Sequence, residues 1–134
     1  MRDLVFFIPS IENGGVEKNL FLLLRYLSKK NNKIHLITAS TDFKKAKLNK
    51  NINIIKPASP YWNNKGRIFK YLICSIILIK FFFKKKIVIF SFQANVFAIL
   101  ISLIIKAKII IRLNTSTDKY MHNFLQKKMY KFFY

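Results

Sequence analysis

The chain has 134 residues, which is enough for one domain of ordinary size and too few for two. Hydrophobic residues make up 52% and aromatic residues 16%, so the chain can bury a core and is not predominantly disordered. A single cysteine excludes an internal disulfide and two histidines provide no set of zinc ligands. This use of cysteine favours a reducing compartment.

The charge of the chain is strongly unbalanced, because 25 basic residues stand against five acidic ones and give a net charge of +20. Such a charge attracts anionic partners, namely nucleic acid, an acidic lipid surface or the phosphates of a nucleotide. Only four of the basic residues are arginine, and the chain is rich in residues that A+T-rich codons encode. Two interpretations therefore stay open, a selected binding surface and a compositional bias of the gene.

The sequence predicts neither a cleavable signal nor a membrane span. The apolar run at residues 4–8 is stopped by Pro9 and is too short for the core of a signal peptide. Lysines interrupt the apolar segments 68–83 and 87–111, and the first is shorter than the ~20 residues that a bilayer span needs. We expect buried helices or helices on a membrane surface, in a cytoplasmic protein; an integral membrane protein built on residues 68–83 and 94–105 is the competing interpretation.

The chain opens with a pattern typical of strand, turn and helix. Residues 4–8 form a continuous apolar run, as in a strand that is buried on both faces of a sheet. The polar turn at residues 10–15 contains two adjacent glycines, which can take positive φ and let a ligand approach the backbone. Apolar residues then recur on one face of a helix, which is predicted over residues 16–30.

The alternation of strands and helices continues along the rest of the chain. Further strands are predicted at residues 34–39, 52–55, 87–92 and 109–113. Further helices are predicted at residues 65–84, 94–107 and 117–134, with a short helix or loop at residues 42–50. Because strand and helix take turns five times and the strands lack polar alternation, we predict an α/β fold. It is a Rossmann-like, doubly wound parallel sheet with helices on both faces.

Polar residues gather where the first, fourth and fifth strands end. In an open parallel sheet, ligands bind outside the carboxyl ends of the strands, where the strand order reverses. These three strands are neighbours in the usual order, so we expect their loops to face one crevice. The residues are Ser10, Asn13, Gly14 and Gly15 after the first strand, Ser91, Gln93 and Asn95 after the fourth, and Arg112, Asn114, Thr115 and Ser116 around the end of the fifth.

Three features of this crevice each have two interpretations. The Gly14-Gly15 turn directs backbone N–H groups and the positive end of a helix dipole at an anionic or hydroxyl-rich ligand, although any tight strand-to-helix turn favours glycine. Glu17 lies in the first helical turn, where the dipole stabilises a carboxylate, and a ligand contact is the alternative. Arg112, at the end of an apolar strand, needs either a carboxylate or a bound anion.

The sequence contains no recognisable catalytic or metal-binding set. His35 lies in an apolar strand and is interpreted as a satisfied core residue, His122 as a solvated residue, and Cys74 as a small core residue. Neither the dinucleotide-binding glycine motif nor the phosphate-loop motif is present. Since no nucleophile, base and orienting residue and no carboxylate pair can be assembled, we assign no catalytic residue and no metal.

The order of these elements resembles the N-terminal domain of family 4 glycosyltransferases, which have the GT-B fold. In that family the first strand leads into a Gly-Gly-x-Glu turn, and here Gly14-Gly15-Val16-Glu17 follows the first predicted strand. The resemblance covers essentially the whole chain. It is carried by residues 5–10, 13–18, 27–30, 35–38, 91–95 and 111–114.

The resemblance implies the transfer of a sugar from a nucleotide-diphosphate donor to an acceptor hydroxyl, in the synthesis of a cell-envelope polysaccharide or glycolipid. It implies no metal ion and no cofactor besides the nucleotide sugar. The site residues that it implies are Asn13, Gly14, Gly15 and Glu17, near the donor diphosphate or the acceptor, and Gln93, Asn95, Arg112 and Asn114 on the acceptor side.

The resemblance also implies that residues 1–134 form the acceptor-side domain alone. In this family a second domain carries the nucleotide site, and no part of this chain corresponds to it, so we expect the isolated chain to be inactive. The expected partners are the donor, an acceptor glycan or lipid-linked sugar, the missing domain and an anionic membrane surface on the inner face of the membrane. The competing interpretation is a non-enzymatic basic α/β module that binds nucleic acid or an anionic membrane surface.

Overall fold

The computed structural model describes residues 3–12, 14–30, 33–40, 48 and 51–113. Within these residues one parallel sheet contains the strands β1 (Asp3–Phe7), β2 (Ile34–Ile37), β3 (Ile52–Ile55), β4 (Ile87–Ser91) and β5 (Lys108–Ile111). Their spatial order is β3-β2-β1-β4-β5, and every neighbouring pair is parallel. The helices are α1 (Gly15–Ser28), α2 (Arg67–Phe82) and α3 (Asn95–Ile104), with a 3-10 helix η1 (Pro60–Asn64) before α2.

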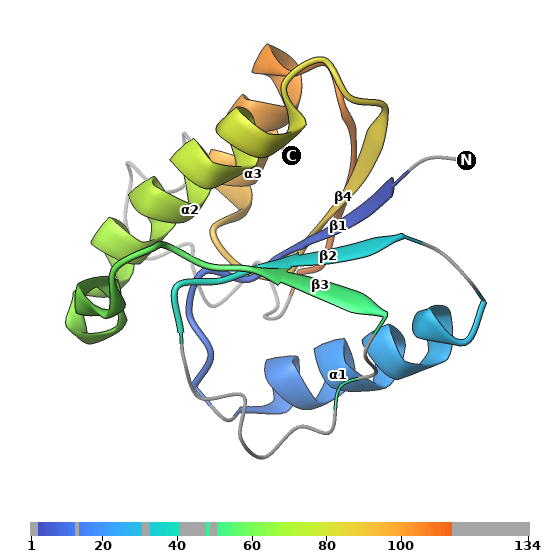
Figure 1. Ribbon diagram of the computed structural model, residues 1–134, viewed down its shortest axis with the longest axis horizontal. Helices are drawn as coiled ribbons and strands as arrows, with labels where there is room; N and C mark the ends of the chain where they lie inside the picture. The colour runs from blue at the N-terminus through green and yellow to red at the C-terminus, as the bar shows by residue number, and fades with distance from the viewer. Residues whose placement is uncertain (1–2, 13, 31–32, 41–47, 49–50, 114–134) are drawn as a thin grey trace.

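The helices cover both faces of the sheet, as Figure 1 shows, so the predicted doubly wound α/β fold is confirmed. On one face, Leu24 of α1 packs in a cluster with Phe6 of β1. On the other face, Leu78 of α2 packs in a cluster with Val5 and Phe7, and α3 lies beside α2. Successive residues of a strand point to opposite faces, which is why neighbouring side chains of β1 belong to different cores.

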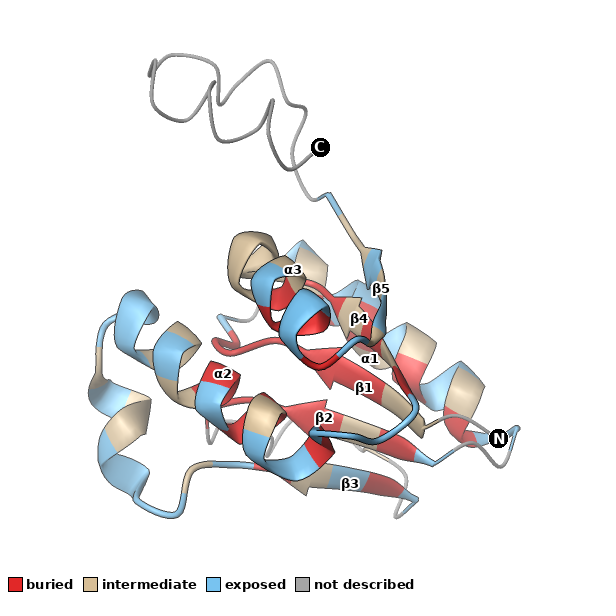
Figure 2. Ribbon diagram, turned by 90° about the horizontal axis from the view of Figure 1, so that it is seen from above, coloured by how far each residue is buried: buried red, intermediate tan, exposed pale blue. Residues whose placement is uncertain are grey.

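The depth of burial explains the apolar runs in the sequence. Val5, Phe6 and Phe7 of the central strand are fully buried, and Figure 2 shows the middle of the sheet enclosed between the helices. A strand covered on both faces has no polar side, so its sequence does not alternate. At the edge strand β5, Ile109 packs against the core under α2 and α3, whereas Ile110 is half exposed on the other face.

The elements end earlier than the sequence predicts because the chain leaves regular geometry at particular residues. The helix predicted over residues 65–84 begins only at Arg67, because the backbone of the preceding Gly66 is extended, and the 3-10 helix η1 lies before the predicted range. It ends before Lys84, which lies in the left-handed region with φ 65°. In the same way, α3 ends before Lys106, with φ 53°. The predicted helix over residues 117–134 and most of segment 42–50 lie outside the described residues.

β3 ends where the sequence predicts, and the other four strands end one or two residues before the predicted limits, although the chain stays paired beyond some of them. Ile8 N donates to Ile37 O at 3.1 Å, and Phe92 N donates to Phe7 O at 3.1 Å. These single bonds extend each ladder past its last strand residue, so the loops leave the sheet with their first residues still fixed. As for membrane crossing, none of the helices described has the length and apolarity that a bilayer span needs.

The packing of α1 can be tested with two leucines on the same helix. Leu24 is fully buried, whereas Leu22 is 62% exposed. We expect Leu24→Ala to lower the free energy of unfolding by about 2–5 kcal/mol through lost burial and a residual cavity. Leu22→Ala should change it by no more than about 0.5 kcal/mol. Urea unfolding followed by circular dichroism measures both, and equal effects would contradict the observed orientation of α1.

Candidate functional site

The strand order places a reversal between β1 and β4. The chain leaves β1 through α1 towards β2 on one side, and leaves β4 through α3 towards β5 on the other (Figure 1). In an open parallel sheet the crevice outside such a reversal is where ligands bind. The candidate site is therefore the carboxyl edge of β1 and β4, with the loops that follow them.

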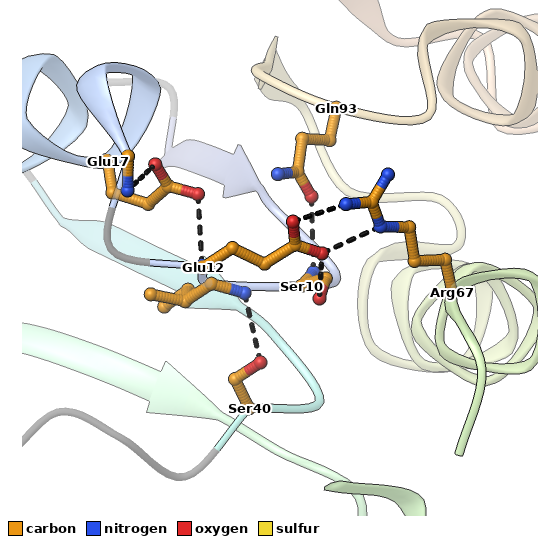
Figure 3. A network of polar contacts seen from close by, with 8 residues as sticks. Ser10, Glu12, Glu17, Ser40, Arg67 and Gln93 are labelled. Carbon is orange, nitrogen blue, oxygen red and sulfur yellow. Dashed lines mark hydrogen bonds and ion pairs between the residues drawn. The ribbon is translucent and has the colours of Figure 1, made fainter. Parts of the chain in front are cut away.

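The loops after β1, β2 and β4 are joined by hydrogen bonds at this edge (Figure 3). Ser10 N, after β1, donates to Gln93 Oε1, after β4, at 3.3 Å. Ile11 N donates to Ser40 Oγ, after β2, at 2.9 Å. The structure thus brings Ser10 and Gln93 together, as the sequence predicts, and adds Ser40, which the sequence did not single out. Asn13, Asn114, Thr115 and Ser116 lie outside the described residues.

The Glu17 side chain shapes the turn before α1. Only 4% of Glu17 is exposed, and both of its carboxylate oxygens accept hydrogen bonds from backbone N–H groups. Gly14 N donates to Oε2 at 2.8 Å and Glu12 N donates to Oε1 at 3.1 Å. A carboxylate in the first turn also interacts favourably with the helix dipole. The observed role of Glu17 is to fix this turn, and a direct ligand contact stays a prediction.

The two glycines of the turn have different reasons to lack a side chain. None of the described glycines has positive φ, and Gly14 has φ −93° and ψ −171°, so the turn does not use the positive φ that glycine allows. A Cβ on Gly14 would lie 2.9 Å from Glu17 Oε2, so glycine there makes room for the carboxylate. A Cβ on Gly15 would meet nothing within 4 Å among the described atoms. The first residue of α1 is therefore open to an approaching group.

An ion pair between Glu12 and Arg67 joins the loop after β1 to the start of α2. Arg67 Nε donates to Glu12 Oε1 at 2.7 Å, and Arg67 Nη2 pairs with Glu12 Oε2. The Arg67 guanidinium holds the pKa of the Glu12 carboxyl below its ordinary value of 4.5. Sequence reasoning missed this pair, which joins residues 55 positions apart. The topology offered one clue to it, because a helix that leads into a strand of a parallel sheet begins at the carboxyl edge, where the loop of Glu12 also lies.

The loop after β4 is strained and held in place. Ala94 has φ 54° and ψ 42°, a left-handed conformation that costs an alanine roughly 1–2 kcal/mol. Ser91 Oγ lies 2.7 Å from Asn95 Oδ1 and donates to it, and Asn95 Nδ2 donates to Arg112 O at 3.3 Å. Asn95 thus connects the ends of β4 and β5. Strain of this kind accumulates at functional sites, where the surrounding structure supports it.

Arg112 lies at the same edge, directly after β5. Its N–H donates to Ser91 O at 3.0 Å, and its guanidinium carbon lies 5.6 Å from the centroid of the Phe92 ring. No carboxylate of the described residues pairs with this guanidinium. Of the two partners that the sequence predicts for Arg112, the carboxylate is therefore not found in the described part of the chain, and a bound anion stays a prediction.

Two further groups, His35 and Cys74, do not belong to the candidate site. His35 Nε2 lies 3.3 Å from Asp3 Oδ2, and His35 Nδ1 lies 3.2 Å from Asn53 Nδ2. Both ring nitrogens of His35 therefore have polar partners, which confirms its interpretation as a residue whose hydrogen bonds are satisfied within the fold. Cys74 is fully buried, and burial raises the pKa of its thiol to about 12, so the thiolate is not formed at neutral pH. The described residues contain no cluster of ligating side chains that could hold a metal.

The turn before α1 can be tested with two alanine substitutions. We expect Gly14→Ala to lower the free energy of unfolding by about 1–2 kcal/mol, because the new Cβ displaces a charged hydrogen-bond acceptor. Gly15→Ala should raise it by up to about 1 kcal/mol, because alanine favours the helix and meets no neighbour. Urea unfolding measures both variants. A comparable loss in the two would contradict the distinction between these glycines.

The Glu12–Arg67 pair can be tested through acid stability. A lowered carboxyl pKa contributes stability at pH values above 4.5, which is lost as the pH falls through the pKa of the folded state. Both side chains are more than two-fifths exposed, so we expect no more than about 1 kcal/mol between pH 7 and pH 3. Arg67→Gln should remove this part of the acid dependence, whereas Arg25→Gln on α1 should retain it. Identical pH profiles of unfolding for these two variants would contradict the assignment.

The chain was also compared with known proteins. No protein-family model, no curated protein and no solved structure matches it. The candidate site combines a strand-order reversal, a helix N-terminus open at Gly15, and an arginine after β5.

Proposed function

We propose that the chain is the acceptor-side domain of a glycosyltransferase. It would help to move a sugar from a nucleotide-diphosphate donor to an acceptor hydroxyl, together with a nucleotide-binding domain that these residues do not contain. The observation that carries the proposal is the N-terminus of α1 at the strand reversal, fixed by Glu17 and open at Gly15. The order of the elements and the Gly-Gly-x-Glu turn resemble the family, and this resemblance adds to the proposal.

The helix N-terminus supports a role in binding phosphate oxygens or hydroxyls. The first N–H groups of a helix have no intrahelical acceptor, and here the ladder begins with Lys18 N donating to Gly14 O. The N–H groups at the start of α1 can therefore donate to a ligand, and Gly15 adds no side chain to obstruct it.

The charge of this edge supports the need for a second domain. The Glu17 carboxylate offsets part of the positive potential of the helix, and Glu12 already pairs with Arg67. A leaving diphosphate would need further cations, which the resemblance assigns to the domain across the cleft. We therefore infer that the isolated chain binds a nucleotide sugar weakly and transfers no sugar.

The acceptor side would be formed by the loops after β4 and β5. Gln93 uses its amide oxygen to accept from Ser10, which leaves its amide NH2 group to donate to a sugar hydroxyl. The Arg112 guanidinium over the Phe92 ring would bind a phosphate or hydroxyl of the acceptor. The acceptor is then a glycan or a lipid-linked sugar, in line with the resemblance.

The donor side can be tested by NMR titration of the 134-residue chain with nucleotide sugars and with inorganic diphosphate. We expect weak, saturable shifts of the Gly15 and Val16 amides. Gly15→Leu should abolish them by filling the open position, whereas Gly66→Leu at the start of α2, which also meets no neighbour, should retain them. Shifts that persist in Gly15→Leu, or that spread over the lysine-rich surface, would contradict the donor assignment.

The acceptor side requires a separate titration with mono- and disaccharides. We expect at least one of these glycans to shift the side-chain amide of Gln93 and to lose that effect in Arg112→Gln. A chain that responds to diphosphate and to no glycan would contradict the acceptor role and leave the donor role standing.

A further inference from the structure

A cavity of about 550 Å³ lies at the opposite, amino edge of the sheet, where β4 and β5 begin. The segments that join α2 to β4 and α3 to β5 form its walls, and Figure 1 shows the C-terminal ends of α2 and α3 together there. Five lysines line it, namely Lys84, Lys85, Lys86, Lys106 and Lys108. No carboxylate belongs to the described lining, so the cavity has a strongly positive potential.

Two of these lysines occupy positions that favour other residues. Lys84 and Lys106 have φ 65° and 53°, in the left-handed region, which suits glycine or asparagine. A+T-rich codons encode asparagine as readily as lysine, so codon bias does not explain lysine at these two positions. The dipole of each helix favours a cation at its C-terminus, but it does not offset the mutual repulsion of five lysines around one cavity. An anionic ligand would offset that repulsion.

The rim of the cavity combines these cations with exposed apolar side chains. Phe83 is 51% exposed and Ile104 is 59% exposed, and both line the cavity. The Lys84 ammonium lies 5.8 Å from the centroid of the Phe83 ring. Leu103, next to Ile104, is also exposed. Lysines beside exposed aromatic and aliphatic side chains are typical of surfaces that lie in a membrane interface, where cations bind headgroups and apolar side chains enter the acyl region.

We propose that this cavity binds the phosphate headgroup of an anionic lipid, and that the C-terminal ends of α2 and α3 dock on an anionic bilayer. The lysines supply the charge complementarity, and Phe83 and Ile104 insert below the headgroups. A nucleic acid would meet the same lysines but would not bury these two side chains. The inference does not depend on the proposed sugar transfer, because the docking surface and the candidate site lie at opposite edges of the sheet.

Sedimentation of the 134-residue chain with vesicles tests whether the lysines of the cavity attract anionic lipid. We expect binding to phosphatidylglycerol vesicles that weakens with added salt, and none to phosphatidylcholine vesicles. K84N/K106N should weaken binding roughly tenfold to thirtyfold, since each lysine near a membrane surface contributes roughly fivefold. Asparagine suits the left-handed backbone, so this variant should also resist urea at least as well as the wild type.

The matched control is K18Q/K56Q, which removes the same charge at the carboxyl edge, where both lysines are exposed. It should change the affinity for the vesicles by less than about threefold. An equal loss in K84N/K106N and K18Q/K56Q would overturn the proposal, because the binding would then follow net charge alone. Binding of phosphatidylcholine vesicles with equal affinity would overturn it as well.

Insertion is tested with a single fluorescent reporter, Phe83→Trp in a Trp62→Phe background. We expect a blue shift on phosphatidylglycerol vesicles and quenching by lipids brominated on the acyl chain, with no such shift on addition of inorganic phosphate. A response to free phosphate without a response to vesicles would overturn docking and leave a small-anion site. Displacement of the chain from vesicles by a short duplex DNA or RNA at lower concentration than lipid would overturn it in favour of nucleic acid.

Discussion

The parallel pairing of β1 with both of its neighbours determines the rest of the structure. β1 pairs with β2 on one side and with β4 on the other, and its apolar side chains fill the cores on both faces. Because all strands run the same way, every loop that follows a strand emerges at one edge, and every segment that leads into a strand lies at the other. The two edges consequently contain different residues, which allows them to perform different tasks.

The charges of the two edges differ for physical reasons. At the carboxyl edge, the carboxylates of Glu12 and Glu17 are each used within the protein, one by Arg67 and the other by backbone N–H groups. At the amino edge, lysines follow the C-terminal ends of α2 and α3 without a carboxylate in the cavity that they line. The two carboxylates of the carboxyl edge are thus engaged within the protein, whereas the described lining of the amino-edge cavity carries only cations and is available to an anionic partner.

The sequence predicted the fold well because burial on both faces leaves a direct trace, the uninterrupted apolar run of residues 4–8. It did not predict the Glu12–Arg67 pair, since that contact depends on α2 beginning at Arg67, directly after the extended Gly66. It also related the glycine turn to the positive φ that glycine allows, whereas the space needed by the Glu17 carboxylate explains Gly14. The sequence did not show the lysine cavity, because Lys106 and Lys108 come beside lysines 84–86 only through the pairing of β4 with β5. Contacts between distant segments decide each of these features.

The fully buried Cys74 is an internal probe of the local opening of the fold. Its thiol is the only one in the sequence, and it lies in the core between α2 and the sheet with a pKa of about 12. Reaction with an alkylating agent therefore requires that α2 first separate from the sheet, and the rate of labelling counts such openings. A ligand bound at the carboxyl edge and a membrane bound at the amino edge would each stabilise the packing of α2 and lower the rate of Cys74 labelling. One thiol can therefore report on binding at both edges of the sheet.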